Sequence, residues 1–284
     1  MALTLHNYQR RAADFASRAK RCALHMDIGT GKTITALTAI VELLDCFDTR
    51  GVMVFGPLRV VTIAWPEEIA KWKFALNVQV VRGTAGQRQR QLRSPAHVYL
   101  LNYELLPWWC DFVLAETKAK RQVRQDMLVL DESSRLKAHD SARFKALKPL
   151  VDSALFPRVV ELTGTPAPED YLDLFSQYRL LDRGDALTPY ITHFKHLYYD
   201  QNPYSEFDWK LKDGAAAAIE ARIAPLTFTA RAADYLELPS LLEHVIHVNL
   251  PAEARRHYEE VEADMLTVVS DTTVVAPSAA IVSE

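Results

Sequence analysis

The sequence is poor in glycine and cysteine and has no long apolar run. Only nine of its 284 residues are glycine, and only Cys22, Cys46 and Cys110 are cysteine. The cysteines have no metal-ligand spacing and do not form an even disulfide framework, which is typical of a reducing compartment. No apolar run reaches the roughly 18 residues of a membrane-spanning helix, and charges come too early for a signal peptide. These absences predict a soluble intracellular protein with no membrane partner.

The chain also lacks a large excess of basic or of acidic residues. The chain carries 33 basic and 36 acidic residues, a formal net charge of −3. This sum neither indicates nor excludes a nucleic-acid partner, because such binding depends on a local basic surface. A chain of this length can form one large α/β domain, or one domain and part of a second.

What the chain does have is an alternation of short apolar runs with amphipathic stretches. Continuous apolar runs are typical of strands that are covered on both faces, as in a parallel sheet. Such alternation predicts a doubly wound α/β fold. We expect strands at Cys22–Met26, Val52–Phe55, Val78–Val81, His97–Leu101, Met127–Leu130 and Val159–Leu162. We expect helices at Thr33–Leu44, Thr62–Phe74, Gly86–Leu92 and Ala142–Leu150.

The pattern changes after Asp182. An aromatic-rich stretch and the helical run "AAAAIEARI" predict an insertion over residues 183–240 that returns to the first domain, 1–182. A strand at "EHVIHVNL" and a charged helix at "EARRHYEEVEADML" follow within residues 241–284. One strand and one helix cannot form an independent core, so this last part is predicted to be a linker and an incomplete second lobe.

The stretch "HMDIGTGKTITAL" predicts a phosphate-binding loop. Gly29, Thr30 and Gly31 follow an expected strand, and Lys32 and Thr33 open an expected helix. Glycines let backbone N–H groups face phosphate oxygens, and a helix N-terminus favours the negative charge. Lysine would then reach the β- and γ-phosphates of ATP, and threonine would bind Mg²⁺. The plainer alternative is a strand-to-helix turn with an exposed lysine.

The stretch "MLVLDESS" predicts the metal-binding and catalytic carboxylates. Asp131 and Glu132 end an apolar strand about a hundred residues after Lys32. A phosphate-loop enzyme needs one carboxylate for Mg²⁺ and a second group to orient the attacking water. Asp131 would bind the metal and Glu132 would act on the water. The alternative is a helix N-cap with an acidic first turn.

A third turn, "LTGTPAP", follows another apolar strand. Thr163, Gly164 and Thr165 bring two hydroxyl groups to the same edge of the predicted sheet. They would lie beside the γ-phosphate and respond to its loss. A plain turn remains the alternative, because glycine and proline are common in turns everywhere.

Five ordered blocks carry a resemblance to a known family. "MDIGTGKT", "FGPLRVVTIAWPEEIAKW", "LNYELL", "LDESS" and "LTGTPAPEDYLDLFSQYRLLD" resemble the Swi/Snf-like branch of the superfamily 2 helicase-like ATPases, in the compact form found in phages and bacteria. The resemblance covers residues 5 to about 181. It implies a RecA-like lobe that binds ATP and Mg²⁺, duplex DNA as partner alongside other nucleic-acid-processing proteins, and the cytoplasm of a bacterium or a phage-infected cell.

The resemblance also assigns roles to individual residues. It implies ATP binding by Gln9, which would read adenine, and by the loop residues Asp27, Gly29, Thr30, Gly31, Lys32 and Thr33. It implies catalysis by Lys32, Asp131 and Glu132, with Mg²⁺ on Thr33 and Asp131. It implies coupling of hydrolysis to movement by Ser134, Thr163, Gly164 and Thr165. It implies nucleic-acid contacts by Pro57, Arg59, Asn102 and Tyr103.

The chain departs from the family pattern in three places. Met26 replaces a small residue of the loop, and Ser134 stands where many relatives carry histidine. No block resembles the arginine finger of the second lobe, which is worth about 10³–10⁵ in turnover. We therefore expect a lobe of a DNA translocase that hydrolyses ATP weakly by itself. The alternative is a non-motor nucleotide-binding adaptor that recruits nucleic-acid-processing partners; a small-molecule kinase is less consistent with the "LTGTP" turn.

Two basic stretches are further candidates for a phosphate backbone. The first carries Arg82, Arg88, Arg90 and Arg93, and the second carries Lys118, Lys120, Arg121 and Arg124. Backbone contacts need cations without a fixed spacing, so a solvated surface has the same pattern. The aromatic residues Tyr198, Tyr199, Phe207 and Trp209 could stack on bases, but we expect them to pack the insertion onto the sheet.

Overall fold

The computed structural model describes residues 4–153, 155–167, 170–201, 209–235, 249–264, 266–269 and 272–275. The chain divides into two compact units, Met1–Leu238 and Pro239–Glu284. Among the described residues, no helix is both long and apolar enough to span a membrane.

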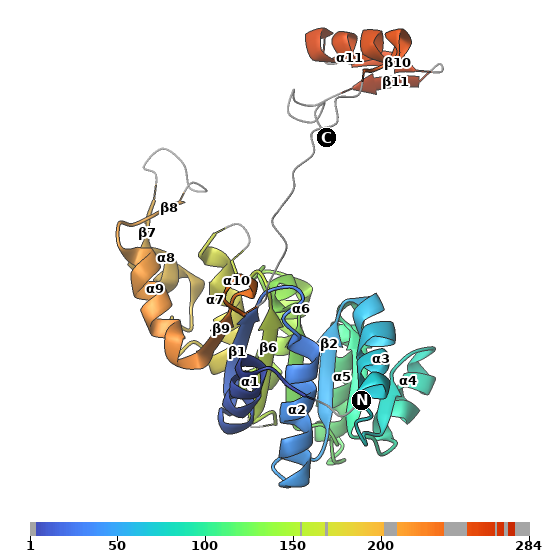
Figure 1. Ribbon diagram of the computed structural model, residues 1–284, viewed down its shortest axis with the longest axis vertical. Helices are drawn as coiled ribbons and strands as arrows, with labels where there is room; N and C mark the ends of the chain where they lie inside the picture. The colour runs from blue at the N-terminus through green and yellow to red at the C-terminus, as the bar shows by residue number, and fades with distance from the viewer. Residues whose placement is uncertain are drawn as a thin grey trace. The chain divides into compact units, whose positions relative to one another are not determined.

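The first unit is built on a seven-stranded sheet with the order β3-β4-β2-β5-β6-β1-β9, in which every neighbouring pair is parallel (Figure 1). The expected doubly wound α/β fold is therefore confirmed. The strands are β1 (Arg21–Met26), β2 (Val52–Gly56), β3 (Val78–Val80), β4 (Val98–Asn102), β5 (Met127–Asp131), β6 (Arg158–Thr163) and β9 (Thr227–Ala230).

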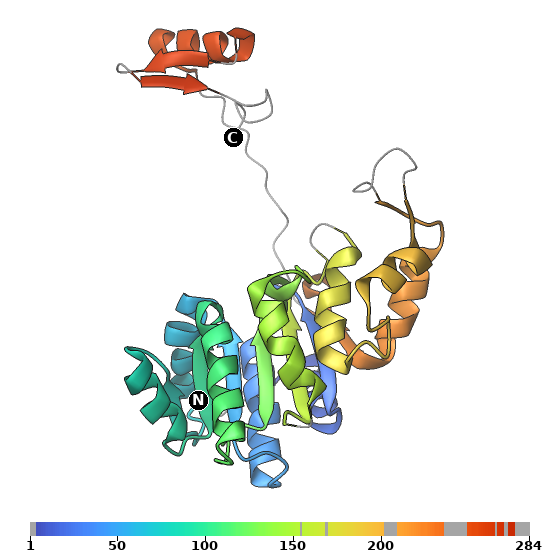
Figure 2. The ribbon, with the colours of Figure 1, turned by 180° about the vertical axis from the view of Figure 1, so that it is seen from behind.

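Helices cover both faces of this sheet. Helices α1, α2 and α3 lie on the face toward the viewer in Figure 1, and α5, α6 and α7 lie on the face seen from behind in Figure 2. The helices are α1 (Asn7–Arg18), α2 (Lys32–Asp45), α3 (Trp65–Lys71), α4 (Ala85–Arg93), α5 (Leu106–Lys118), α6 (Ala142–Asp152) and α7 (Leu172–Asp182). A π-helical turn, Val60–Ala64, leads into α3, and short 3₁₀ turns lie at Tyr103–Leu105 and Ser133–Leu136.

Alternate residues of each strand enter two separate hydrophobic cores. In β2, Val52 and Val54 join the core under α1–α3, whereas Met53 and Phe55 join the core under α5–α7. All five residues of this strand are buried. Because both faces are covered, the central strands can be apolar throughout, which is the pattern that made them predictable.

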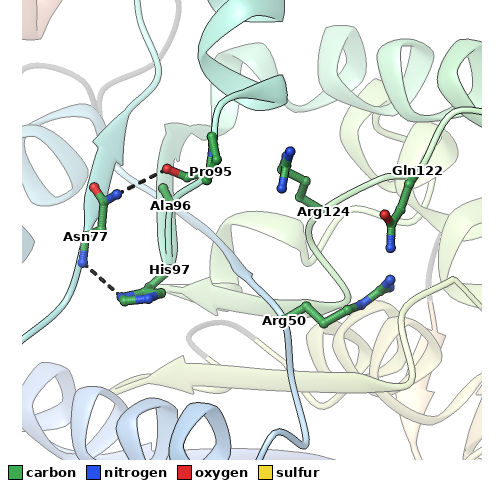
Figure 3. Close-up of a pocket in the computed structure, with 7 residues that line it drawn as sticks. All are labelled: Arg50, Asn77, Pro95, Ala96, His97, Gln122 and Arg124. Carbon is green, nitrogen blue, oxygen red and sulfur yellow. Dashed lines mark hydrogen bonds between the residues drawn. The ribbon is translucent and has the colours of Figure 1, made fainter.

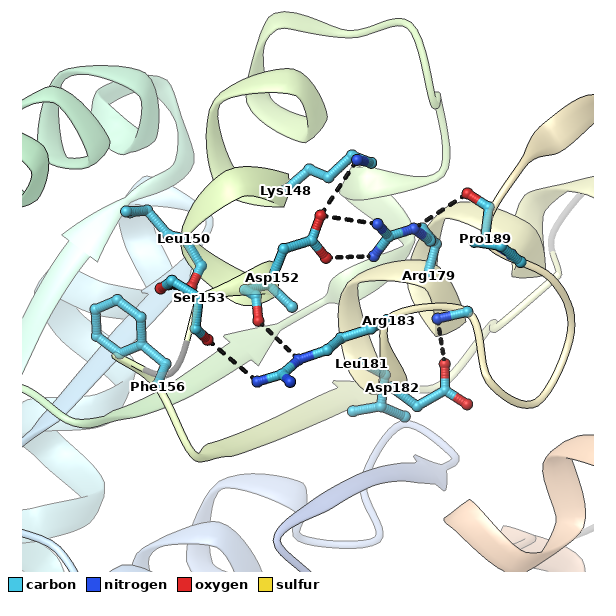
Figure 4. Close-up of polar contacts among 12 residues, drawn as sticks. Lys148, Leu150, Asp152, Ser153, Phe156, Arg179, Leu181, Asp182, Arg183 and Pro189 are labelled. Atoms are coloured by element: carbon cyan, nitrogen blue, oxygen red, sulfur yellow. Dashed lines mark hydrogen bonds and ion pairs between the residues drawn. The ribbon is translucent and has the colours of Figure 1, made fainter.

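Arginine side chains tie the helices together where β1 and β6 begin (Figure 4). Arg179 on α7 forms two hydrogen bonds with the carboxylate of Asp152 at the end of α6, of 2.7 and 2.8 Å. Arg21 donates to the carbonyl oxygen of Leu181 at 2.7 Å and to that of Phe156 at 2.8 Å. The end of α7 is thereby fixed at the amino edge of the sheet, opposite the loops that follow the strands.

The segment after α7 forms a small subdomain before the chain returns to the sheet. It contains α8 (Ile191–Tyr198), the antiparallel pair β7 (Tyr199–Gln201) and β8 (Trp209–Leu211), α9 (Ala215–Ile223) and a 3₁₀ turn (Ala224–Leu226). Helix α10 (Ala232–Tyr235) follows the return strand β9. Tyr198 and Tyr199 are buried against Phe194, as expected for packing residues, and Trp209 is partly buried. Phe207 lies outside the described residues.

The second unit contains α11 (Ala252–Asp264) and an antiparallel hairpin of β10 (Leu266–Val269) and β11 (Thr272–Val275). The helix agrees with the charged stretch expected there. The strand expected at 243–250 falls largely outside the described residues, which omit 236–248. The boundaries 1–182, 183–240 and 241–284 stay predictions.

Candidate nucleotide site

The loop between β1 and α2 has the backbone of a phosphate cradle. Gly29 and Gly31 both have φ = +84°, a left-handed conformation that favours glycine. Gly31 is the N-cap of the 14-residue helix α2, so the helix N-terminus opens directly at the loop. A Cβ at Gly31 would collide with the side-chain amide of Gln9. Glycine is therefore required both by the turn and by a close neighbour.

Helix α1 holds this loop from the side. The hydroxyl of Tyr8 and the Nε2 atom of Gln9 both donate to the carbonyl oxygen of Thr30, at 3.0 and 2.9 Å. The Oε1 atom of Gln9 accepts from the backbone N–H of His6 at 2.9 Å. Gln9, predicted to read adenine, thus lies against the loop with both ends of its amide oriented.

Asp27 ties the same loop to the segment after β9. Its backbone N–H donates to the carbonyl oxygen of Ala230 at 3.2 Å, and its Oδ2 atom accepts from the N–H of Ala232 at 2.8 Å. The ring of Tyr235 stacks on Tyr8 with centroids 4.5 Å apart. Asp27 was predicted to bind ATP; in the structure its hydrogen bonds to Ala230 and Ala232 hold the loop against the segment after β9.

Lys32 lies at the centre of the candidate site. Its Nζ atom donates to the carbonyl oxygen of Met26 at 3.0 Å and lies 4.0 Å from Oε1 of Glu132. A Cβ at Gly164 would lie 3.3 Å from the same Nζ atom, so the "TGTP" turn runs directly past the lysine. The three motifs singled out in the sequence therefore meet around one ammonium group.

The two acidic residues differ in environment. Asp131 is 3% exposed and accepts a 2.8 Å hydrogen bond from the indole N–H of Trp65. Burial raises the pKa of Asp131 to about 6. Glu132 has φ = +56°, unusual for a glutamate, and its side chain is 36% exposed. A buried carboxylate at the strand end suits metal binding, and a more exposed neighbour suits work on a water molecule.

A contact that the sequence analysis missed joins the second and third motifs. The hydroxyl of Ser133 donates to Oε1 of Gln177 at 2.9 Å, and Nε2 of Gln177 donates to the carbonyl oxygen of Pro166 at 2.6 Å. The Oγ1 atom of Thr163 accepts from the N–H of Thr165 at 3.1 Å, which orders the turn. The coupling roles predicted for Ser134, Thr163, Gly164 and Thr165 stay predictions. No sequence spacing marks Gln177, 44 residues after Ser133.

Known proteins resemble this chain over most of its length. A family model described as "SNF2-related domain" matches residues 8–281. The chain belongs to this family. Protein p41 of Acyrthosiphon pisum secondary endosymbiont phage 1 is 30% identical over 272 residues, which cover 92% of this chain and 58% of that protein.

Two further similarities agree with this assignment. "SWI/SNF-related matrix-associated actin-dependent regulator of chromatin subfamily A-like protein 1" of Xenopus laevis is 31% identical over 171 residues, 60% of this chain and 16% of that protein. The "Sulfolobus solfataricus SWI2/SNF2 ATPase core in complex with dsDNA" superposes with a TM-score of 0.64 at 23% identity, covering 93% of this chain and 53% of that one. The latter likeness concerns the fold. The chain spans little more than half of the phage protein and of this archaeal core.

The residues predicted to contact nucleic acid follow two neighbouring strands of this SNF2-related domain. Pro57 and Arg59 follow β2, and their segment is only partly buried. Asn102 ends β4 and its amide donates to Glu104 at 2.6 Å. Tyr103 is fully buried beside Phe55, so its side chain is not available to a ligand on the surface. Any nucleic-acid contact of this residue would use its backbone.

The end of the first basic stretch, at Arg93, meets the second stretch at the opposite, amino edge of the sheet. Arg93 and Arg121 both pair with Glu116, and Nε of Arg124 donates to the carbonyl oxygen of Arg93 at 2.8 Å. A pocket of about 210 Å³ lies beside them, with Arg50 and Arg124 on its rim (Figure 3). Its other lining residues are Asn77, Pro95, Ala96, His97 and Gln122. These cations therefore lie away from the loops that carry the candidate nucleotide site.

Proposed function

We propose that this chain is the ATP-binding lobe of a DNA-dependent ATPase of the Swi/Snf-like class, which hydrolyses ATP to move on duplex DNA when complete. The observation that carries the proposal is the convergence of Lys32, Glu132 and Gly164, from three separate motifs, beside a helix N-terminus. Family membership supports ATP hydrolysis in general. DNA as partner is supported by the archaeal core, whose title places it in complex with dsDNA.

The donor set fits ATP and Mg²⁺. Two left-handed glycines and the start of α2 offer backbone N–H groups to phosphates. Thr33 and Asp131 would hold the metal, since a hydroxyl and a carboxylate are ligands that Mg²⁺ accepts. Bound Mg²⁺ would neutralise charge on the β- and γ-phosphates. Gln9 would bind the adenine from the side of α1.

The remaining chemistry falls to this chain's own side chains. Lys32 would exchange its bond to the Met26 carbonyl for phosphate oxygens, because a charged acceptor binds the ammonium more strongly than a neutral carbonyl. Glu132 would orient a water molecule and accept its proton. The hydroxyl groups of Thr163 and Thr165 would respond to loss of the γ-phosphate. Ser134 would couple this response to movement of the protein.

Several finer features belong to the same proposal. Hydrolysis by this chain alone would be weak, because an arginine from a second lobe completes such sites in the family. Pro57, Arg59 and Asn102, together with the backbone of Tyr103, would line the path of the DNA. Other nucleic-acid-processing proteins would be further partners, and the protein would work in the cytoplasm of a bacterium or a phage-infected cell, in keeping with the phage relative.

The deciding experiment is phosphate release by the purified chain with and without duplex DNA. Lys32→Ala and Glu132→Gln are the control variants. The first removes the ammonium group of the candidate site, and the second removes the carboxylate that would act on the water molecule. We expect a weak turnover that each variant lowers further, and that duplex DNA stimulates at least in a version that carries a second lobe. ATP binding with no DNA response in the two-lobed version would instead favour a nucleotide-binding adaptor. Absence of ATP binding would contradict both functions.

A further inference from the structure

A buried tryptophan contacts the carboxylate that we assign to the metal. Trp65 is the first residue of α3 and is 0% exposed. Its indole N–H donates to Oδ2 of Asp131 at 2.8 Å, across 66 residues of sequence. A buried carboxylate needs such a partner, because a polar group that leaves water without a hydrogen bond destabilises the folded state.

The tryptophan is held in place by an unusual turn. The chain leaves β2 at Gly56 and passes through the π-helical turn Val60–Ala64 before Trp65. A Cβ at Gly56 would lie 3.0 Å from Cγ1 of Val61 and 3.5 Å from Cβ of Asp131. The end of β2 therefore lies between this turn and the end of β5. Single π turns within helices are often found at functional sites.

We propose that Trp65 is a positioning residue for the metal-binding carboxylate: its indole N–H fixes one oxygen of Asp131 and leaves the other to face the metal. This inference rests on the proposed function, since it assumes that Asp131 binds Mg²⁺ with ATP. A carboxylate with one oxygen held by a rigid donor loses less entropy when the metal binds. Loss of such outer partners typically lowers metal affinity about 10–100-fold.

The chain offers a matched control. Trp109 is also 0% exposed, and its indole nitrogen has no hydrogen-bond partner among the described residues. Trp65→Phe and Trp109→Phe therefore remove the same atoms from buried rings, but only the first removes a hydrogen bond. The difference between the two variants isolates the indole N–H of Trp65 from the general loss of packing.

The test is equilibrium binding of a fluorescent ATP analogue by the full chain as Mg²⁺ is varied, with a parallel titration in EDTA. For Trp65→Phe we expect the half-saturating Mg²⁺ concentration to rise about tenfold or more, with unchanged affinity in EDTA. Trp109→Phe is expected to match the wild type in both titrations. An unchanged half-saturating Mg²⁺ concentration in folded Trp65→Phe would overturn the inference but leave the proposed function standing. A wild type that binds no analogue would overturn both.

A measurement on the wild type covers the case in which Trp65→Phe does not fold. Mn²⁺ in place of Mg²⁺, with a non-hydrolysable ATP analogue, is expected to broaden the indole N–H signal of Trp65 in a ¹⁵N-tryptophan NMR spectrum. The reason is that a paramagnetic ion on Asp131 would lie within a few ångströms of this proton. A Trp65 signal that stays sharp at saturating Mn²⁺ and analogue would overturn the inference.

Discussion

At the scale of the single residue, a buried glutamate lies close to the candidate site. Glu161 lies in β6, two residues before Thr163, and is 1% exposed. Its Oε1 atom has no hydrogen-bond partner among the described residues. Burial raises the pKa of Glu161 well above its usual value. The side chain is therefore protonated in the folded protein at a pH where it ionises in the unfolded chain.

Glu161→Gln is expected to raise the free energy of unfolding, and to raise it more at pH 8 than at pH 5. The unfolded glutamate releases its proton near pH 4.3 while the folded one keeps it, so the wild type loses stability as the pH rises above that value. Glutamine does not ionise, so this loss of stability with rising pH is expected to be smaller in the variant. Urea unfolding at pH 5 and pH 8 measures the change in the free energy of unfolding between the two pH values, and Glu67→Gln, at an exposed position, is the control. Equal slopes in wild type and Glu161→Gln would contradict the prediction.

The same scale shows what could be predicted from the sequence and what could not. Gly29, Gly31, Lys32 and Asp131 belong to short motifs whose chemistry depends on neighbours in sequence, and the structure brings their motifs together. The bond between Trp65 and Asp131 joins residues 66 positions apart. Such pairings arise from strand order and helix packing, which leave no local spacing to recognise.

At the scale of the element, one carboxylate joins α4, α5 and the loop after α5. Glu116 accepts from Nη2 of Arg93 at 2.8 Å and from Nη2 of Arg121 at 2.6 Å, and its side chain is 4% exposed. Hydrogen bonds from these two guanidinium groups lower the pKa of Glu116 to about 2. The charged form is thus stabilised in the folded protein, and the two basic stretches are fixed against each other.

Glu116→Gln is expected to lower the free energy of unfolding by about 1–3 kcal/mol at pH 7. A folded pKa below the unfolded one stabilises the protein above about pH 4.3, and this contribution is lost as the pH falls toward 2. The difference between variant and wild type should therefore shrink by pH 3. Thermal unfolding at both pH values checks it, with Glu42→Gln, from an exposed pair with Arg10, as control. A loss that is the same at both pH values would contradict the assignment.

Elements differed in how far the sequence could predict them. Strands β1 to β6 were expected from short apolar runs, and their positions are confirmed within one or two residues. Strand β9, with the sequence Thr-Phe-Thr-Ala, was not assigned as a strand. It pairs with β1 at the edge of the sheet and is only partly buried. Its existence depends on pairing with a distant strand, because four residues of mixed polarity carry too little pattern.

At the scale of the whole molecule, the nucleotide loop and the segment that leads toward the second unit are in contact within the first unit. Asp27 and Tyr8 bind the loop to Ala232 and Tyr235. A change of the loop on nucleotide binding would therefore be felt at α10, which contains both residues.

Turnover by the chain as a monomer depends on whether one chain supplies every group of the site. We expect phosphate release about 10³–10⁵-fold slower than in a two-lobed ATPase of the class, because an arginine that stabilises charge in the transition state accounts for a factor of that size. The measurement is phosphate release per chain over a range of chain concentrations, with the monomer fraction determined by light scattering. Slow turnover that does not depend on concentration agrees with a single lobe that lacks this group. Turnover that rises with concentration would place the missing cation on a neighbouring copy, and fast turnover by a verified monomer would show that this chain supplies the cation itself.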